Sequence, residues 1–122
     1  MIAYELMNEP WPGDPYLNPL VMIPGLSELI HMQEAYDIIS HNIREVDPEH
    51  NICFEPVTWS NFLRAGFTHP PGGHKHRNTS VFCYHYYNPP TFNLPKFMKA
   101  RMKDIKRLKV GGILSEFYVI NK

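Results

Sequence analysis

Apolar residues gather in four short runs along the chain, and longer polar or mixed stretches separate these runs. The runs are residues 2–8, 52–57, 80–87 and 111–117. Most positions in each run are apolar or aromatic, without the strict alternation of a strand that has one face in water. This pattern is typical of strands that are covered on both faces. The sequence therefore predicts four buried β-strands.

Two longer segments repeat apolar residues at every third or fourth position, which is the spacing of one face of an α-helix. In segment 27–46 the apolar stripe comprises Leu29, Met32, Tyr36, Ile39, Ile43 and Val46. In segment 94–109 it comprises Leu94, Met98, Met102, Ile105 and Leu108. Ser27 is expected to cap the first helix, and Pro95 favours the start of the second.

Strands that alternate with helices indicate parallel pairing through right-handed crossovers. The expected strand starts lie 50, 28 and 31 residues apart, and the long first step contains a proline-rich insertion, residues 10–26. One βα unit of a (β/α)8 TIM barrel takes about 30 residues. We therefore expect an α/β fold, a partial TIM barrel with about four parallel strands and two main helices, over residues 1–122. An open four-stranded sheet is the alternative, although its apolar edges would be unpaired.

Composition and charge exclude several classes of protein. The chain has 122 residues, of which 43% are hydrophobic and 20% charged, as in a folded globular domain. Twelve basic residues balance twelve acidic ones, so no overall field favours a nucleic-acid partner. No run is apolar enough to span a membrane, and the first residues do not form a signal peptide.

Cysteines and histidines give no sign of a metal centre. Cys53 and Cys83 lie in predicted buried strands, where free thiols are more common than a disulfide. His69, His74 and His76 share one loop that is rich in proline and glycine, and we expect them to be exposed rather than to bind a metal.

Polar side chains follow the apolar runs at the points where the predicted strands end. In chain order they are Asn8, Glu9, Glu55, Trp59, His85, Tyr87 and Glu116. The active site of a (β/α)8 barrel lies at these strand ends. A carboxyl pair there can cleave a glycosidic bond, because one carboxyl protonates the leaving oxygen and the other attacks the sugar carbon or activates water. We therefore expect Glu9 and Glu116 to converge within about 5–6 Å.

Three motifs in order resemble glycoside hydrolase family 5, a family of retaining (β/α)8 enzymes. They are Asn8-Glu9-Pro10, His85-Tyr86-Tyr87 and Ser115-Glu116-Phe117. The longer strings at residues 4–11, 54–59 and 84–90 resemble the endoglycoceramidases within this family. The resemblance covers nearly the whole chain. It implies a partial catalytic domain, truncated at both ends, that carries strands four to seven of the barrel.

The resemblance also implies roles for individual residues. Glu9 matches the acid/base and Glu116 the nucleophile, while Asn8 matches the residue that binds the sugar 2-hydroxyl. His85 and Tyr87 match a pair that supports substrate and nucleophile, and Tyr87 is expected to hydrogen bond to the Glu116 carboxylate. Two close carboxyls do not both ionise easily, so in the intact enzyme we expect a raised pKa for Glu9 and an ionised Glu116.

Two further residues are candidates for substrate contacts, each with a structural alternative. Glu55 can bind substrate or anchor loops at the barrel mouth, and Trp59 can stack on a sugar or pack on the barrel rim. Glu5 is expected in the polar floor of the barrel, outside the chemistry.

The implied activity is retaining hydrolysis of the β-glycosidic bond between a sugar or oligosaccharide and ceramide in glycosphingolipids, without a metal or organic cofactor. A cellulase-like β-glucanase and a non-catalytic truncated product are the alternatives. The family's arginine and histidine from strands two and three, and its strand-eight tryptophan, have no counterpart here. We therefore expect the isolated chain to be inactive.

Two surface features suggest contact with a membrane surface. Segment 10–26 is apolar for a loop, and the helix over 94–109 is rich in lysine and arginine. Ordinary packing and a solvated outer face are the alternatives. Asn78-Thr79-Ser80 is a glycosylation sequon, which matters only for an exported protein. We expect the full-length protein to be secreted or endolysosomal.

Overall fold

The computed structural model describes residues 2–58 and 62–120, and a parallel β-sheet lies at their centre. The strands are β1 (Ala3–Glu5), β2 (Asn51–Phe54), β3 (Ser80–Asn88) and β4 (Gly111–Val119). They lie in the order β1-β2-β3-β4, and each neighbouring pair is parallel. The predicted α/β class with four parallel strands is confirmed, although β1 and β2 are shorter than the apolar runs. The expectation that all four strands are buried is wrong for the two outer strands of the described sheet, because β4 is almost entirely exposed and β1 has no fully buried residue.

Both predicted helices are present. The first consists of a π-helical turn, η2 (Glu28–Met32), followed by α1 (Gln33–Val46), and the second is α2 (Leu94–Leu108). Two short 3₁₀ helices, η1 (Pro19–Met22) and η3 (His74–Thr79), are not predicted by the sequence pattern. Within residues 2–58 and 62–120, no helix is long and apolar enough to cross a membrane.

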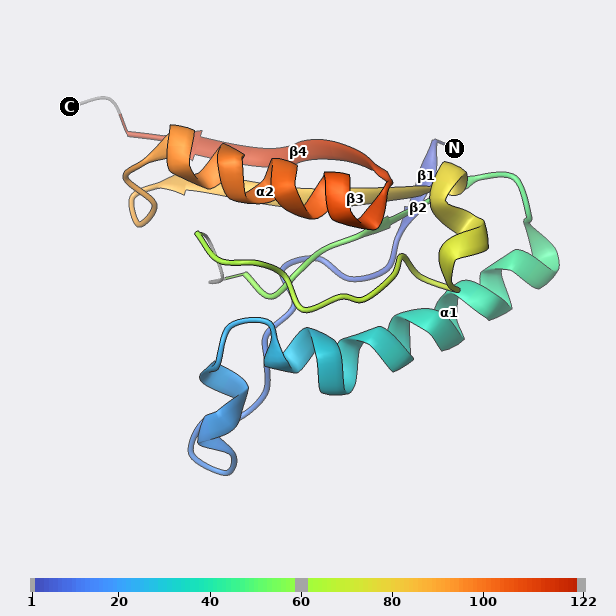
Figure 1. Ribbon diagram of the computed structural model, residues 1–122, viewed down its shortest axis with the longest axis horizontal. Helices are drawn as coiled ribbons and strands as arrows, with labels where there is room; N and C mark the ends of the chain where they lie inside the picture. Colours follow the sequence, from blue (N-terminus) through green and yellow to red (C-terminus); the bar gives the residue numbers. More distant parts are fainter. Residues whose placement is uncertain (1, 59–61, 121–122) are drawn as a thin grey trace.

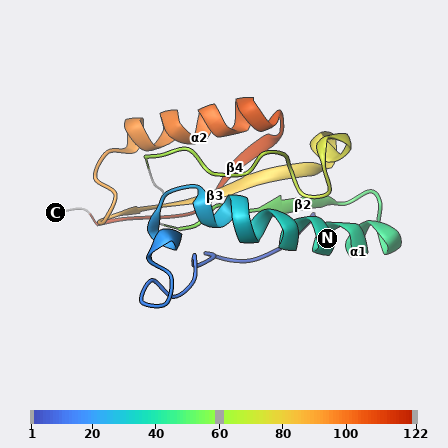
Figure 2. The same ribbon diagram turned by 60° about the horizontal axis from the view of Figure 1, so that its bottom comes forward.

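Ser27 does not cap the first helix as expected. Its hydroxyl lies 3.1 Å from the carbonyl oxygen of Pro12 and 3.2 Å from that of Val21, to which it can donate a hydrogen bond. Ser27 therefore ties segment 10–26 to the start of the helix. The tip of this segment projects away from the sheet, as the blue ribbon shows in Figures 1 and 2.

The hydrophobic core lies between one face of the sheet and the helices. It comprises Met32, Tyr36, Phe54, Val57, Ala65, Phe67, Phe82, Tyr84, Tyr86, Phe97 and Leu108. Aromatic rings meet edge to face across β2 and β3, where the centroids of Phe54 and Phe82 are 5.3 Å apart. The extended segment 62–73 runs between α1 and α2 and supplies Phe67 to this core (Figure 1).

The face that helix α2 buries overlaps the predicted stripe only in part. Leu108 is buried, and Met98 and Ile105 pack against the core as partly buried residues. Its buried side chains are Phe97, Arg101, Asp104 and Leu108. Met102, which belongs to the predicted stripe, is exposed. Asp104 accepts a hydrogen bond from the backbone N–H of Ala65 at 3.3 Å and pairs with Arg101 at 3.3 Å and Arg107 at 3.0 Å. A search for apolar periodicity does not detect buried charges that satisfy one another in this way.

Candidate active site

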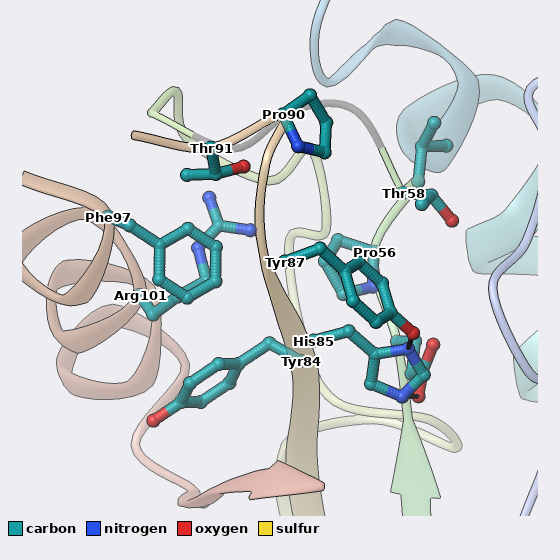
Figure 3. A pocket seen from close by; sticks show the side chains of 11 residues that line it. Pro56, Thr58, Tyr84, His85, Tyr87, Pro90, Thr91, Phe97 and Arg101 are labelled. Carbon is teal, nitrogen blue, oxygen red and sulfur yellow. Dashed lines mark hydrogen bonds and ion pairs between the residues drawn. The ribbon is translucent and has the colours of Figure 1, made fainter. Parts of the chain in front are cut away.

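The two β3 residues that the sequence predicts to belong to the site lie on the sheet face that points away from the core. His85 and Tyr87 are two residues apart on β3 and therefore share this face. Figure 3 shows both side chains on the same side of the β3 ribbon, opposite to Tyr84 and Phe97. Cys53 and Cys83 are free thiols, as expected.

A β-bulge in β4 brings Glu116 to the same face. Tyr84 pairs with Leu114, but the next residue, His85, pairs with Glu116, so Ser115 has no partner in the register. Successive residues of a strand point to opposite faces. Without the extra residue, Ser115 would lie beside His85 and Glu116 would point toward the helices. Bulges that re-aim a side chain are common next to active sites.

Glu9 reaches the same place from the segment after β1. Its backbone is left-handed, with φ of +46°, which costs a residue with a Cβ about 1–2 kcal/mol. The Glu9 N–H donates a hydrogen bond of 3.0 Å to Oε2 of Glu55. Strained backbone of this kind concentrates at functional sites, where the surrounding structure enforces it.

Glu9, His85, Tyr87 and Glu116 meet in one cluster. The Tyr87 hydroxyl donates to Oε1 of Glu9 at 2.6 Å, and Nδ1 of His85 lies 3.0 Å from the same oxygen. His85 Nδ1 is also 3.7 Å from Oε2 of Glu116. One carboxylate oxygen of Glu9, one of Glu116 and a nitrogen of His85 all lie within 4.8 Å of one another. The predicted convergence of the two carboxyls is confirmed.

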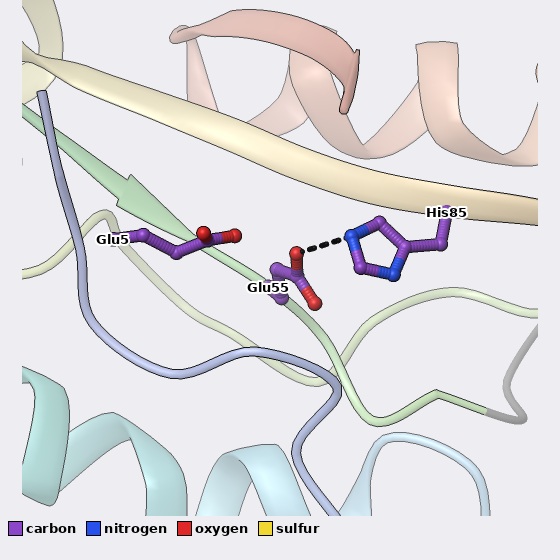
Figure 4. Close-up of side chains that lie close together, drawn as sticks. All are labelled: Glu5, Glu55 and His85. Carbon is purple, nitrogen blue, oxygen red and sulfur yellow. Dashed lines mark ion pairs between the residues drawn. The ribbon is translucent and has the colours of Figure 1, made fainter. Parts of the chain in front are cut away.

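Glu55 lies behind this cluster and is buried, with 3% of its surface exposed. Its Oε1 is 2.8 Å from Nε2 of His85, and Figure 4 shows this ion pair. Glu5 lies on the other side of Glu55, and oxygens of both carboxyls are within 4.8 Å of each other and of the His85 ring. Both oxygens of Glu55 therefore face groups of this chain, which favours a supporting role over a contact with substrate.

A cavity of about 140 Å³ adjoins the cluster. It extends from His85 and Tyr87 past the segment after β2 to Phe97 and Arg101, so that it reaches both sides of β3 (Figure 3). Its lining is mainly apolar and aromatic near α2 and polar near Glu55.

In this chain the pKa of Glu9 shifts in the direction opposite to the one expected for the intact enzyme. The hydrogen bond from the Tyr87 hydroxyl, and next that from His85, lower the pKa of Glu9 below its ordinary value. Burial is the main cause that raises the pKa of Glu55 to about 7, and the contact with Glu5 adds to it. Burial is the main cause that raises the pKa of Tyr87, and the carboxylates of Glu9 and Glu116 add to it. The Tyr87 hydroxyl donates its proton to Glu9 and not to Glu116, which differs from the expected hydrogen bond.

Three other sequence predictions concern Asn8, Trp59 and the histidines of the loop after residue 68. Asn8 is exposed beside Glu9. Trp59 lies outside the described residues. His69 is not simply an exposed loop residue, because its Nε2 lies 3.0 Å from the carboxylate of Asp37 on α1. The fold brings this carboxylate to the loop from 32 residues away in the sequence.

The distances between potential ligand atoms around His85 are short enough for a metal ion to bind. Glu5, Glu55 and His85 form one group of potential ligands within 4.8 Å, and Glu9, His85 and Glu116 form another. His85 belongs to both groups. Its Nδ1 is hydrogen bonded to Oε1 of Glu9 at 3.0 Å, and its Nε2 lies 2.8 Å from Oε1 of Glu55. The expectation that the site needs no metal stays a prediction.

The comparison with protein families agrees with this geometry. The family model described as cellulase (glycosyl hydrolase family 5) matches residues 1–122. The chain therefore belongs to glycoside hydrolase family 5, a family of O-glycosyl hydrolases, and the parallel α/β sheet is part of its TIM barrel.

Two curated proteins are similar over nearly the whole chain. An endoglycoceramidase from Hydra vulgaris is 47% identical over 120 residues, which cover 98% of this chain and 23% of that protein. An endoglycoceramidase from Cyanea nozakii is 49% identical over 120 residues, which cover 98% of this chain and 24% of that protein. The chain thus spans about a quarter of the length of these relatives. No solved structure matches it significantly.

Proposed function

We propose that this chain supplies the two catalytic carboxyls of a retaining β-glycosidase. The observation that carries the proposal is the approach of Glu9 and Glu116, whose side-chain oxygens lie within 4.8 Å. Retaining enzymes hold their two carboxyls about 5–5.5 Å apart, whereas inverting enzymes separate them by about 6.5–9.5 Å to admit a water molecule. The spacing therefore supports retention.

In the proposed mechanism each carboxyl acts in both steps. Glu116 attacks the anomeric carbon while Glu9 protonates the leaving oxygen, and a covalent glycosyl-enzyme forms. In the second step Glu9 removes a proton from a water molecule as the water oxygen attacks the anomeric carbon. The bond to Glu116 breaks, which releases the sugar and regenerates the Glu116 carboxylate. These roles follow the family motifs. The lowered pKa of Glu9 in the free site suits the second step, when Glu9 must be a carboxylate.

We further propose that the bond cleaved joins a sugar to ceramide in a glycosphingolipid. Two endoglycoceramidases resemble the chain over 98% of its length. Large apolar side chains of segment 10–26 are exposed close to Glu9 in the sequence, and they suit a lipid rather than a soluble polymer. They are Trp11, Tyr16, Leu17, Leu20, Met22 and Ile23. Contact with a membrane surface through this segment belongs to the same proposal.

The family model also describes cellulases, so a soluble β-glucan is the second candidate substrate. The test uses the full-length protein product of the gene, supplied with a fluorescent ganglioside in mixed micelles or with a cello-oligosaccharide. We expect release of ceramide from the ganglioside and its loss in the Glu116→Gln variant. Cleavage of the cello-oligosaccharide alone would favour the glucanase.

We also propose a secreted or endolysosomal location for the full-length protein. The support is the sequon at Asn78, whose side chain is exposed on η3. A shift in mobility after endoglycosidase treatment of the native protein, absent in an Asn78→Gln variant, tests this.

A further inference from the structure

Helix α2 carries much of the positive charge of the chain. Six of the twelve lysines and arginines lie on it, against one acidic residue, Asp104. Asp104 is buried and is paired with Arg101 and Arg107. Four lysines of the helix are exposed, and none of them forms a salt bridge within residues 2–58 and 62–120: Lys96, Lys99, Lys103 and Lys106. The exposed side of α2 is therefore strongly positive.

A groove separates α2 from the extended segment that begins at residue 62. Its volume is about 550 Å³, and both of its walls belong to this chain. Asp104 is the one carboxyl residue among the described lining residues, and its oxygens face the two arginines. Four exposed basic side chains line the groove, namely Arg64, Lys96, Lys99 and Lys103. The groove therefore suits an anionic group.

Apolar side chains are exposed at the end of this groove where α2 begins. Phe62 lines the groove, and the Lys96 ammonium is 4.8 Å from the centroid of its ring. Leu63 is 54% exposed, and Phe92, in the loop before α2, is 76% exposed. Lysines beside exposed apolar groups are typical of surfaces that lie in a membrane interface, where the apolar groups enter the lipid and the ammonium groups stay near the headgroups. Together they form the α2 rim, which comprises Phe62, Leu63, Phe92, Lys96 and Lys99.

The α2 rim lies at the end of the molecule where the strands end and the candidate site lies. Helix α2 follows β3 in the chain, so its first turn is at the carboxyl edge of the sheet. Figures 1 and 2 both place the start of α2 and the tip of segment 10–26 toward this end, and η3 and the end of α1 toward the opposite end. A flat surface that touches the rim can therefore also touch the exposed apolar residues of segment 10–26.

We propose that the α2 rim docks the protein on a bilayer that contains anionic phospholipid. A bilayer fits better than a soluble polyanion such as a sulfated glycan, because a polyanion would leave the exposed apolar side chains in water. An α-helix rises about 1.5 Å per residue, so Lys99 lies about 5 Å along the axis from Lys96, whereas Lys106 lies about 15 Å away. Salt screens charges over about 8 Å at physiological ionic strength. Lys96 and Lys99 therefore attract the membrane, and Lys106 does not.

The test measures binding of the full-length protein product of the gene to vesicles of phosphatidylcholine, alone or mixed with phosphatidylserine. Each lysine near an anionic membrane strengthens binding about fivefold, so Lys96→Gln/Lys99→Gln should bind the mixed vesicles about 25-fold more weakly and the neutral vesicles as before. Lys75→Gln/Lys106→Gln is the matched control, because it removes the same charge from η3 and from the far end of α2. An equal loss in both variants, or equal binding of the wild type to both kinds of vesicle, would overturn the proposal.

The apolar part of the α2 rim is tested by Phe92→Ser. Its ring is exposed, so the fold should tolerate the change, and an unfolding midpoint equal to that of the wild type checks this. Binding to both kinds of vesicle should weaken about tenfold, because the ring no longer enters the lipid. Val46→Ser, at the exposed end of α1, is the control and should bind as the wild type does. Unchanged binding of Phe92→Ser would contradict the proposed docking.

Binding to heparin separates a membrane from a soluble polyanion as the partner. If Lys96→Gln/Lys99→Gln binds heparin more weakly but the mixed vesicles as before, the groove is a site for a soluble polyanion and the proposal is wrong. The proposal goes beyond the proposed glycosidase function, and the vesicles contain no glycoside. A protein that binds the vesicles as expected but cleaves no β-glycoside would therefore refute the proposed function and leave the docking surface in place.

Discussion

The hydrogen bond from the Tyr87 hydroxyl stabilises the ionised form of Glu9. Removal of this hydroxyl tests the roles assigned to Glu9 and Glu116. In Tyr87→Phe the 2.6 Å hydrogen bond to Glu9 is lost. This bond is the largest of the causes that lower the pKa of Glu9, so the pKa of Glu9 should rise. A hydrogen bond to a charged group contributes about 1.5–3 kcal/mol, and the lower end applies because 36% of the Glu9 side chain is exposed.

The lost hydrogen-bond energy sets the size of the change in kcat/KM, and the raised pKa of Glu9 sets the direction in which the pH profile moves. A loss of about 1.4 kcal/mol is about tenfold in rate, so kcat/KM of Tyr87→Phe should fall about tenfold. If Glu9 is the general acid, activity requires its protonated form in the first step, and the alkaline limb of kcat/KM should move to higher pH. If Glu9 were the nucleophile, activity would require its ionised form, and the acidic limb would move instead.

The assay is the pH profile of ceramide release by the full-length protein, with Tyr118→Phe as the control. Tyr118 pairs with Tyr87 in the sheet register but is exposed. Its substitution should leave both limbs in place. A profile of Tyr87→Phe in which neither limb moves would refute the reasoning, and movement of the acidic limb alone would reverse the assigned roles.

Two other predictions concern the bulge and a close backbone contact. Deletion of Ser115 should turn Glu116 toward the helices and lower kcat by at least about 100-fold, whereas Ser115→Gly, which keeps the extra residue, should retain most activity in the same assay. Gly66→Ala should lower stability by about 1–3 kcal/mol in thermal unfolding, because its Cβ would lie 1.7 Å from the carbonyl oxygen of Gly25. Gly111→Ala, whose Cβ would meet only a side chain at 4.0 Å, is the control. Equal effects within either pair would contradict the prediction.

The sequence predicts the framework of the fold well because local patterns determine it. All four strands appear as apolar runs, and their alternation with helices favours a parallel sheet. The runs do not predict burial, because β1 and β4 lie at the edges of the described sheet and β4 is almost entirely exposed. The buried face of α2 is a second exception. Arg101 and Asp104 are buried there because they satisfy each other and the backbone of segment 62–73, and these contacts exist only in the folded chain.

The sequence predicts which residues form the candidate site but not how these residues are arranged in space. Glu9, His85, Tyr87 and Glu116 can be named from motifs and strand ends. The bulge that brings Glu116 beside His85 depends on the pairing of β3 with β4, which no local pattern reveals. The pKa of Glu9 also depends on tertiary structure, because the Tyr87 hydroxyl donates to Glu9 at 2.6 Å.

Glu55 shows a different limit of sequence reasoning. Its position after a buried strand suggests a role at the site but does not distinguish a substrate contact from a support. The distinction comes from burial and from two contacts with residues 46 positions before and 30 positions after it in the chain. Glu55 is 3% exposed, its Oε2 accepts from the Glu9 N–H and its Oε1 lies 2.8 Å from the His85 ring, which favours a supporting role at the site.

The most direct test of the account is to trap the covalent intermediate. The full-length protein is incubated with a 2-deoxy-2-fluoro β-glycoside that carries a good leaving group, digested, and its peptides are analysed by mass spectrometry. The account predicts one fluoroglycosyl group on Glu116, and it predicts that azide partly restores turnover in Glu9→Ala. A label on Glu9, or hydrolysis with inversion and no covalent adduct, would contradict the assignment of Glu116 as the nucleophile of a retaining glycosidase.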